Sequence, residues 1–101
     1  MTTVERRRST RYPLRLPIQV ALLHERGNQL QGQTRDLSSV GVLFQTPEPL
    51  EVGSPVEYTI DLMSNSSLQL RCRGRVVRTG SEGAGVPRLL AATLEQYEFV
   101  R

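Results

Sequence analysis

The sequence predicts an all-β fold, namely a six-stranded antiparallel β-barrel with a flexible N-terminal arm and a short C-terminal tail. Short runs of alternating apolar and polar residues recur along the chain, and turn-forming residues separate them. No segment keeps a helical period for more than a turn or two. Closing such a sheet removes edges that would pair with other chains. The 101 residues suffice for one domain but not for two.

The elements follow from this pattern in chain order. The first twelve residues lack apolar periodicity, and Pro13 and Pro17 disfavour a helix. Residues 1–12 are therefore expected to form the arm, and residues 13–101 the barrel. The clearest strand alternates four apolar residues, from Val56 to Leu62, with polar ones. The predicted strands are at about 17–24, 30–36, 40–45, 56–62, 68–76 and 88–94, and the tail after them carries Tyr97 and Phe99.

The charge of the chain is concentrated at its N-terminus. All thirteen basic residues are arginine, and the net charge is +3. Residues 1–15 hold five arginines against one glutamate, so the remainder carries a slight negative excess. Arginine offers a planar fork that chelates phosphate, carboxylate or a guanine edge and stacks on rings. The arm is therefore expected to meet an anionic partner.

The composition of the chain also indicates the cellular compartment in which the protein is expected. A single cysteine, Cys72, allows no intrachain disulfide and favours a reducing compartment. The longest apolar runs are too short for a transmembrane helix, and the charged start is not followed by the apolar segment of a secretory signal. We expect a cytoplasmic protein without membrane insertion.

An enzyme or a metal site is not expected. The only histidine, His24, ends an apolar run, and one histidine with one cysteine cannot supply a structural zinc site. The sequence has no nucleophile elbow, no P-loop and no dinucleotide-binding glycine motif. No catalytic residue, metal or cofactor is predicted.

The segment from Asp36 to Gly41 is the most suggestive of a binding site. In extended chain Asp36 and Ser38 share a face, which places a carboxylate acceptor beside a hydroxyl. Gly41 would let the backbone come close to a bound group. The alternative is that aspartate and serine only stabilise a turn through local hydrogen bonds.

Two motifs together resemble a known family. Arg7 to Arg11 fits R-x-x-x-R directly before the first strand, and Asp36 to Gly41 fits [D/N]-x-S-x-x-G after the second. This combination on a six-stranded pattern resembles the PilZ domain, the bacterial module that senses cyclic di-GMP. The resemblance covers essentially the whole chain. It departs at 76–78, where many members place an aromatic residue beside the ligand and this chain has Val-Val-Arg.

The resemblance implies a ligand and a role for each motif. Arg7 and Arg11 would hold guanine and phosphate groups from the arm, while Asp36 and Ser38 would contact polar groups of a guanine. Gly41 would let that base lie close to the wall. An arm that folds over the ligand would create a new surface for a downstream protein partner.

Arg6 suggests the number of ligand molecules. It directly precedes the motif and adds a third guanidinium at the mouth of the site. Cyclic di-GMP can form an intercalated dimer, whose additional phosphates and outer guanine a third arginine could bind. We therefore expect two cyclic di-GMP molecules per chain. The alternative is that Arg6 is a solvated member of an arginine run.

Two other functions remain open. One is a PilZ-like adaptor that binds a protein partner without ligand. The other is a small β-barrel that binds nucleic acid, because Arg71, Arg73 and Arg75 share one face of the fifth predicted strand. The scarcity of aromatic residues disfavours single-strand binding, which uses exposed aromatic platforms, so nucleic acid is not the expected partner.

Overall fold

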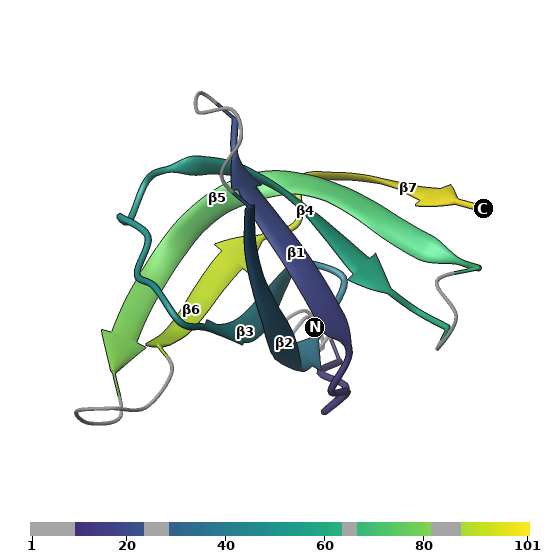
Figure 1. Ribbon diagram of the computed structural model, residues 1–101, viewed down its shortest axis with the longest axis horizontal. Coiled ribbons are helices and arrows are strands. Elements are labelled where there is room, and N and C mark those ends of the chain that lie inside the picture. Colours follow the sequence, from purple (N-terminus) through teal and green to yellow (C-terminus); the bar gives the residue numbers. More distant parts are fainter. Residues whose placement is uncertain (1–9, 24–28, 64–66, 82–87) are drawn as a thin grey trace, which may run out of the picture.

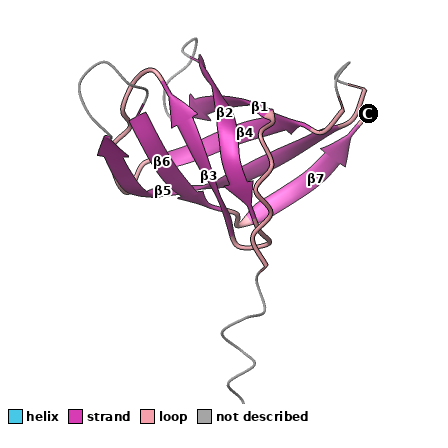
Figure 2. Ribbon diagram, turned by 90° about the horizontal axis from the view of Figure 1, so that it is seen from below, coloured by secondary structure: helices cyan, strands magenta, loops and turns pink. Residues whose placement is uncertain are grey.

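The computed structural model describes residues 10–23, 29–63, 67–81 and 88–101. This part of the chain consists of strands and loops alone (Figure 2). It contains no helix of the length and apolarity needed to cross a membrane. The strands are β1 (Pro17–Leu22), β2 (Gln29–Leu37), β3 (Gly41–Thr46), β4 (Pro55–Asp61), β5 (Gln69–Ser81), β6 (Arg88–Thr93) and β7 (Gln96–Val100).

Six of these strands close a barrel (Figure 1). Their order around the wall is β4-β1-β2-β3-β6-β5, and the pairing of β4 with β5 completes the ring. Every pairing is antiparallel. The predicted six-stranded antiparallel barrel is confirmed, and the predicted strand limits are within two residues except at the end of β5.

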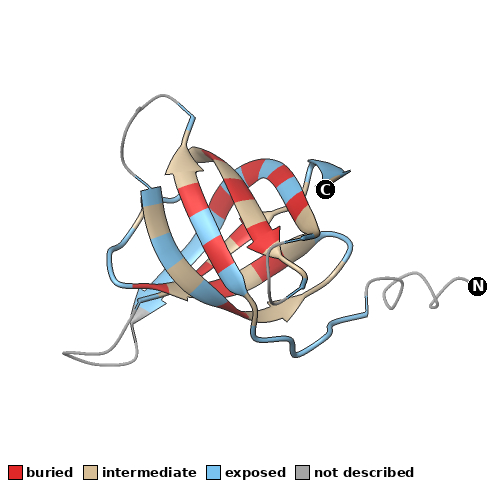
Figure 3. Ribbon diagram, turned by 45° about the vertical axis from the view of Figure 1, so that its right-hand side comes forward, coloured by how far each residue is buried: buried red, intermediate tan, exposed pale blue. Residues whose placement is uncertain are grey.

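The barrel interior is filled by alternate residues of its strands. Figure 3 shows buried and more exposed positions alternating along the wall, as extended strands require. Val20, Tyr58 and Cys72 are register partners on β1, β4 and β5, and all three are buried. The core therefore lies where the period-two pattern of the sequence predicted it.

The C-terminal tail is a seventh strand, which corrects the sequence prediction. β5 is thirteen residues long and ends at Ser81, five residues beyond the predicted end. One edge of its first half pairs with β4, and β6 covers only the second half of the other edge. β7 pairs with the remaining stretch, with Tyr97 opposite Cys72 and Phe99 opposite Leu70. Because β6 pairs with the second half of β5, the backbone of the first half is left free along one edge. The tail forms a strand by pairing with this free edge.

A close backbone contact marks the bend between β6 and β7. The carbonyl oxygen of Thr93 accepts a hydrogen bond from the hydroxyl of Tyr58 at 2.8 Å. It also lies over Gly74, where a Cβ atom would be 1.9 Å from it. Only glycine allows this approach. Gly74 and Tyr58 together fix the point at which the chain leaves the barrel wall.

The base of the arm is attached to β2. Tyr12 exchanges two backbone hydrogen bonds with Leu37, at 2.8 and 2.9 Å. The fully buried Thr34 accepts from the amide of Leu16 and donates to the carbonyl of Leu14 through its hydroxyl. Residues 10–12, the described end of the predicted arm, therefore run beside the end of β2, which carries Asp36 and Leu37.

Candidate functional site

The outer face of the wall holds one row of register partners that spans four strands. Asp36 of β2 pairs with Leu43 of β3, Leu43 with Ala91 of β6, and Ala91 with Arg78 of β5. Both outer strands of this row have a bulge, at Arg35 in β2 and at Val77 in β5. Bulges bend a strand and redirect its side chains. The two polar ends of the row therefore flank a floor formed by β3 and β6.

The floor between them is low. On the outer face of β3 and β6, the pair that follows Leu43 and Ala91 is Gly41 opposite Thr93. A Cβ atom at Gly41 would be 2.6 Å from the carbonyl oxygen of Ala92, so β3 and β6 approach more closely here than a side chain would allow. The small residues leave a shallow cavity of about 340 Å³ over the floor.

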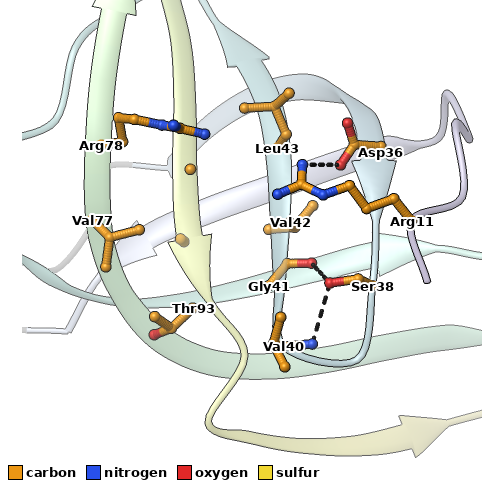
Figure 4. Close-up of a pocket in the computed structure, with 12 residues that line it drawn as sticks. Arg11, Asp36, Ser38, Val40, Gly41, Val42, Leu43, Val77, Arg78 and Thr93 are labelled. Carbon is orange, nitrogen blue, oxygen red and sulfur yellow. Dashed lines mark hydrogen bonds and ion pairs between the residues drawn. The ribbon is translucent and has the colours of Figure 1, made fainter. Parts of the chain in front are cut away.

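Asp36 and Arg11 lie on one side of this cavity (Figure 4). Arg11 Nη1 is 3.4 Å from Asp36 Oδ1. The arginine side chain is 65% exposed and the aspartate side chain 23%. An ion pair of this kind contributes at most about 1 kcal/mol to stability. The contact nevertheless joins the second arginine of the arm motif to the first residue of the Asp36–Gly41 motif.

Ser38 stabilises the turn into β3. Its hydroxyl accepts a hydrogen bond from the amide of Val40 at 3.2 Å and donates to the carbonyl of Gly41 at 3.3 Å. The turn role considered from the sequence is therefore present. Ser38 also lines the cavity, so its hydroxyl can contact a bound molecule after a small rotation.

The structure brings four of the six sequence-predicted site residues together around this cavity: Arg11, Asp36, Ser38 and Gly41. The other two, Arg6 and Arg7, lie outside the described residues, as does His24.

Sequence reasoning did not assign three exposed residues that line the same cavity: Val40, Val77 and Arg78. In the sequence, the segment 76–78 is notable only because it lacks an aromatic residue. The bulge that turns Val77 and Arg78 outward has no sequence signal, because a plain alternation would point Arg78 into the barrel.

The three arginines on the outer face of β5 are paired with carboxylates. Arg71 lies 3.4 Å from Glu98 of β7, Arg73 lies 3.6 Å from Glu57 of β4, and Arg75 lies 3.7 Å from Glu95. The arginines share one face, as predicted, but the glutamates balance their charge. This face therefore lacks the excess of positive charge that binding to the phosphate backbone of a nucleic acid requires.

Two ionisable groups lie in the core, away from the cavity. Burial raises the pKa of the Cys72 thiol to about 12, and burial together with the neighbouring thiol raises the pKa of Tyr58. Both groups are therefore neutral at physiological pH and serve packing and hydrogen bonding. Within the described ranges, no three histidine, cysteine, aspartate or glutamate side chains are placed to hold a metal ion.

The chain is similar to solved structures of the same fold. The inhibitor of motility MotI/DgrA of Bacillus subtilis aligns with 92% of the chain at 16% identity and a TM-score of 0.73. The chain spans 44% of the length of that protein. The PilZ domain of CeSA from a cellulose-synthesising bacterium aligns with 86% of the chain and 83% of its own length, at 24% identity and a TM-score of 0.59.

Sequence comparison gives the family. No curated protein matches the chain. The model of the PilZ domain family matches residues 5–96, which include both motifs and six of the seven strands in full. The chain therefore belongs to the PilZ domain family.

Proposed function

We propose that this protein is a cyclic di-GMP receptor whose arm folds over the ligand against the wall formed by Asp36, Ser38 and Gly41. One observation carries the proposal: the ion pair between Arg11 and Asp36 brings the two motifs to a single cavity. The family is one of receptor and adaptor modules, so the proposed activity is binding and not catalysis. The proposed setting is the bacterial cytoplasm.

The chemistry of the cavity suits this ligand. The Asp36 carboxylate can accept from the N–H groups of a guanine, whereas adenine does not present them in the same arrangement. An arginine bound to a guanine edge adds about 1–3 kcal/mol of discrimination. Gly41 and Ala91 leave the floor low, and the exposed side chains of Val40 and Val77 provide apolar surface for a base. In this proposal Arg7 and Arg11 bind guanine and phosphate groups from the arm side.

The output of the receptor is proposed to be a changed surface at the arm. Tyr12 follows Arg11 directly and is 55% exposed, while its backbone is hydrogen-bonded to Leu37. Ligand binding at Arg11 would therefore order the preceding residues beside an exposed aromatic side chain. A downstream protein partner would recognise this combined surface. The stoichiometry that we propose is two ligand molecules per chain, the second held with the help of Arg6.

Titration calorimetry with cyclic di-GMP tests the proposal, with a short oligonucleotide as control. Saturable binding of cyclic di-GMP alone supports a receptor. Binding of the oligonucleotide alone would assign the protein to the nucleic-acid-binding class, and binding of neither would favour an adaptor without ligand. Amide exchange then tests the switch, because residues 1–11 of the arm should exchange rapidly without ligand and be protected with it, whereas the Tyr12 amide is already hydrogen-bonded to the carbonyl of Leu37. Protection of residues 1–11 before ligand is added would contradict the switch.

A further inference from the structure

Arg78 lies on the side of the cavity opposite Asp36 and has no counterion among the described residues. The described residues that line the cavity include two arginines and one carboxylate. The carboxylate, Asp36, contacts Arg11. Arg78 forms no ion pair with any described residue, and its side chain is exposed. Its positive charge is therefore available to a bound anion.

The position of Arg78 is set by the backbone. Val76 is buried and is the partner of the buried Ala92. Strict alternation would turn the residue two positions later into the barrel as well. The bulge adds Val77 between the two paired positions, so that Arg78 becomes the partner of Ala91 and faces outward. The bulge thus delivers a charged side chain to the floor of the cavity.

The small size of Ala91 gives this side chain room. Figure 4 shows Arg78 extending from β5 over β6 toward Leu43, and the register Arg78–Ala91–Leu43 agrees with this direction. Asp36 and Arg78 are separated by three strand spacings, or about 14 Å along the curved sheet. That span exceeds the width of one base. A ligand held at Asp36 by a guanine would therefore reach Arg78 with a different group.

We propose that Arg78 binds a phosphate group of the ligand and thereby fixes the ligand across the floor between β2 and β5. The inference rests on the proposed function and adds a contact outside the arm and the Asp36–Gly41 motif. A guanidinium binds phosphate through two parallel charge-assisted hydrogen bonds, which makes it the best match for this group. A second anchor far from Asp36 also favours a ligand that carries both a base and a phosphate over a free base.

The test uses the whole chain and cyclic di-GMP in titration calorimetry. Arg78→Gln should raise the dissociation constant at least about ten-fold, because a charge-assisted hydrogen bond is lost. Arg78→Lys should lie between the wild type and Arg78→Gln, since it keeps the charge without the fork. Arg88→Gln is the matched control, because Arg88 is an exposed arginine at the start of β6 that does not line the cavity. It should change the constant less than about two-fold.

Salt dependence separates a phosphate contact from other contacts. The ratio of affinities between wild type and Arg78→Gln should shrink as salt is raised, because screening weakens a charge contact. A ratio that stays constant would overturn the phosphate assignment. Should Arg78→Gln not fold, the same comparison is made with Arg78→Met, which also removes the charge and keeps an unbranched side chain.

Asp36→Ala, measured in parallel, distinguishes the two possible failures. If the wild type does not bind cyclic di-GMP, the proposed function fails. If the wild type binds, Asp36→Ala binds weakly and Arg78→Gln matches Arg88→Gln, then the proposed function stands and the inference about Arg78 is wrong.

Discussion

Arg11 and Asp36, which are twenty-five residues apart in the sequence, meet at 3.4 Å on the outer face of the barrel. The contact is possible because Tyr12 is hydrogen-bonded to Leu37, so the chain just before β1 runs beside the end of β2. An arginine and an aspartate on neighbouring segments thereby form one edge of a cavity. This relationship determines how substitutions at the two positions should differ.

Arg11→Ala should separate binding from stability. The arginine is largely exposed, so its removal should leave the melting temperature nearly unchanged. Affinity for cyclic di-GMP should nevertheless fall at least about ten-fold, because the arm loses a charge-assisted contact. Arg7→Ala should behave alike, whereas Asp36→Ala should weaken binding and also lower stability slightly. Calorimetry and thermal unfolding measure both effects, and wild-type affinity in either arginine variant would refute the motif assignment.

Thr34→Val should loosen the base of the arm. The substitution keeps the size of the buried side chain but leaves the amide of Leu16 and the carbonyl of Leu14 without their partner. An unsatisfied buried polar group costs about 1–3 kcal/mol. We expect a lower urea midpoint and faster amide exchange at residues 12–16. Thr34→Ser, which keeps the hydroxyl, is the control and should retain slow exchange at these amides.

Gly74→Ala should be strongly destabilising, in contrast to Gly80→Ala on the same strand. A Cβ atom at Gly74 would meet the Thr93 carbonyl oxygen at 1.9 Å, whereas the nearest atom to one at Gly80 is 4.0 Å away. Overpacking of this kind costs about 1–3 kcal/mol or more. Thermal unfolding of the two variants makes the comparison. Equal melting temperatures would show that the bend between β6 and β7 does not depend on this contact.

Stability should decline in alkaline solution because of Cys72. Burial raises the pKa of its thiol from an ordinary value of 9.0 to about 12. Between these values the unfolded chain has lost the proton and the folded chain keeps it, so the free energy of unfolding falls as pH rises. The decrease from this group is about 1.4 kcal/mol per pH unit. Tyr58, whose pKa is also raised, adds a decrease in the same direction.

Urea unfolding at pH 8 and pH 10 measures this decline. Cys72→Ala, which lacks the thiol, should show a shallower decline than the wild type. The buried thiol of the wild type should also react with a thiol reagent far more slowly in buffer than in urea. Equal reaction rates in buffer and in urea would contradict the burial on which the prediction depends.

Arg6→Leu should reduce the number of ligand molecules from two to one. An aliphatic side chain would occupy the space of the second molecule and remove a guanidinium from the mouth of the site. Titration calorimetry well above the dissociation constant gives the ratio directly. A ratio of one for the wild-type protein would exclude the two-molecule proposal, whatever the variant does. Arg8→Leu, at a neighbouring arginine outside the R-x-x-x-R pair, is the matched control.

The barrel and both motifs can be predicted from the order of the amino acids alone. Period-two alternation from Val56 to Leu62 and from Leu68 to Val76 identified wall strands, because only inward-facing positions need to be apolar. The positions of the two motifs relative to the first two strands could also be predicted. Four of the six predicted site residues are described in the structure, and all four line one cavity.

Three other features depend on how distant parts of the chain pack together. β7 pairs with the first half of β5 along the edge that β6 leaves uncovered, and the sequence does not show which stretch of a strand edge stays free. The bulge at Val77 shifts the register by one residue and reverses the direction of Arg78. The Arg11–Asp36 contact depends on how the start of the barrel packs on β2. Local alternation specifies which side of a strand faces the core, whereas strand ends, bulges and contacts between distant segments are fixed by hydrogen-bond pairing across the whole sheet.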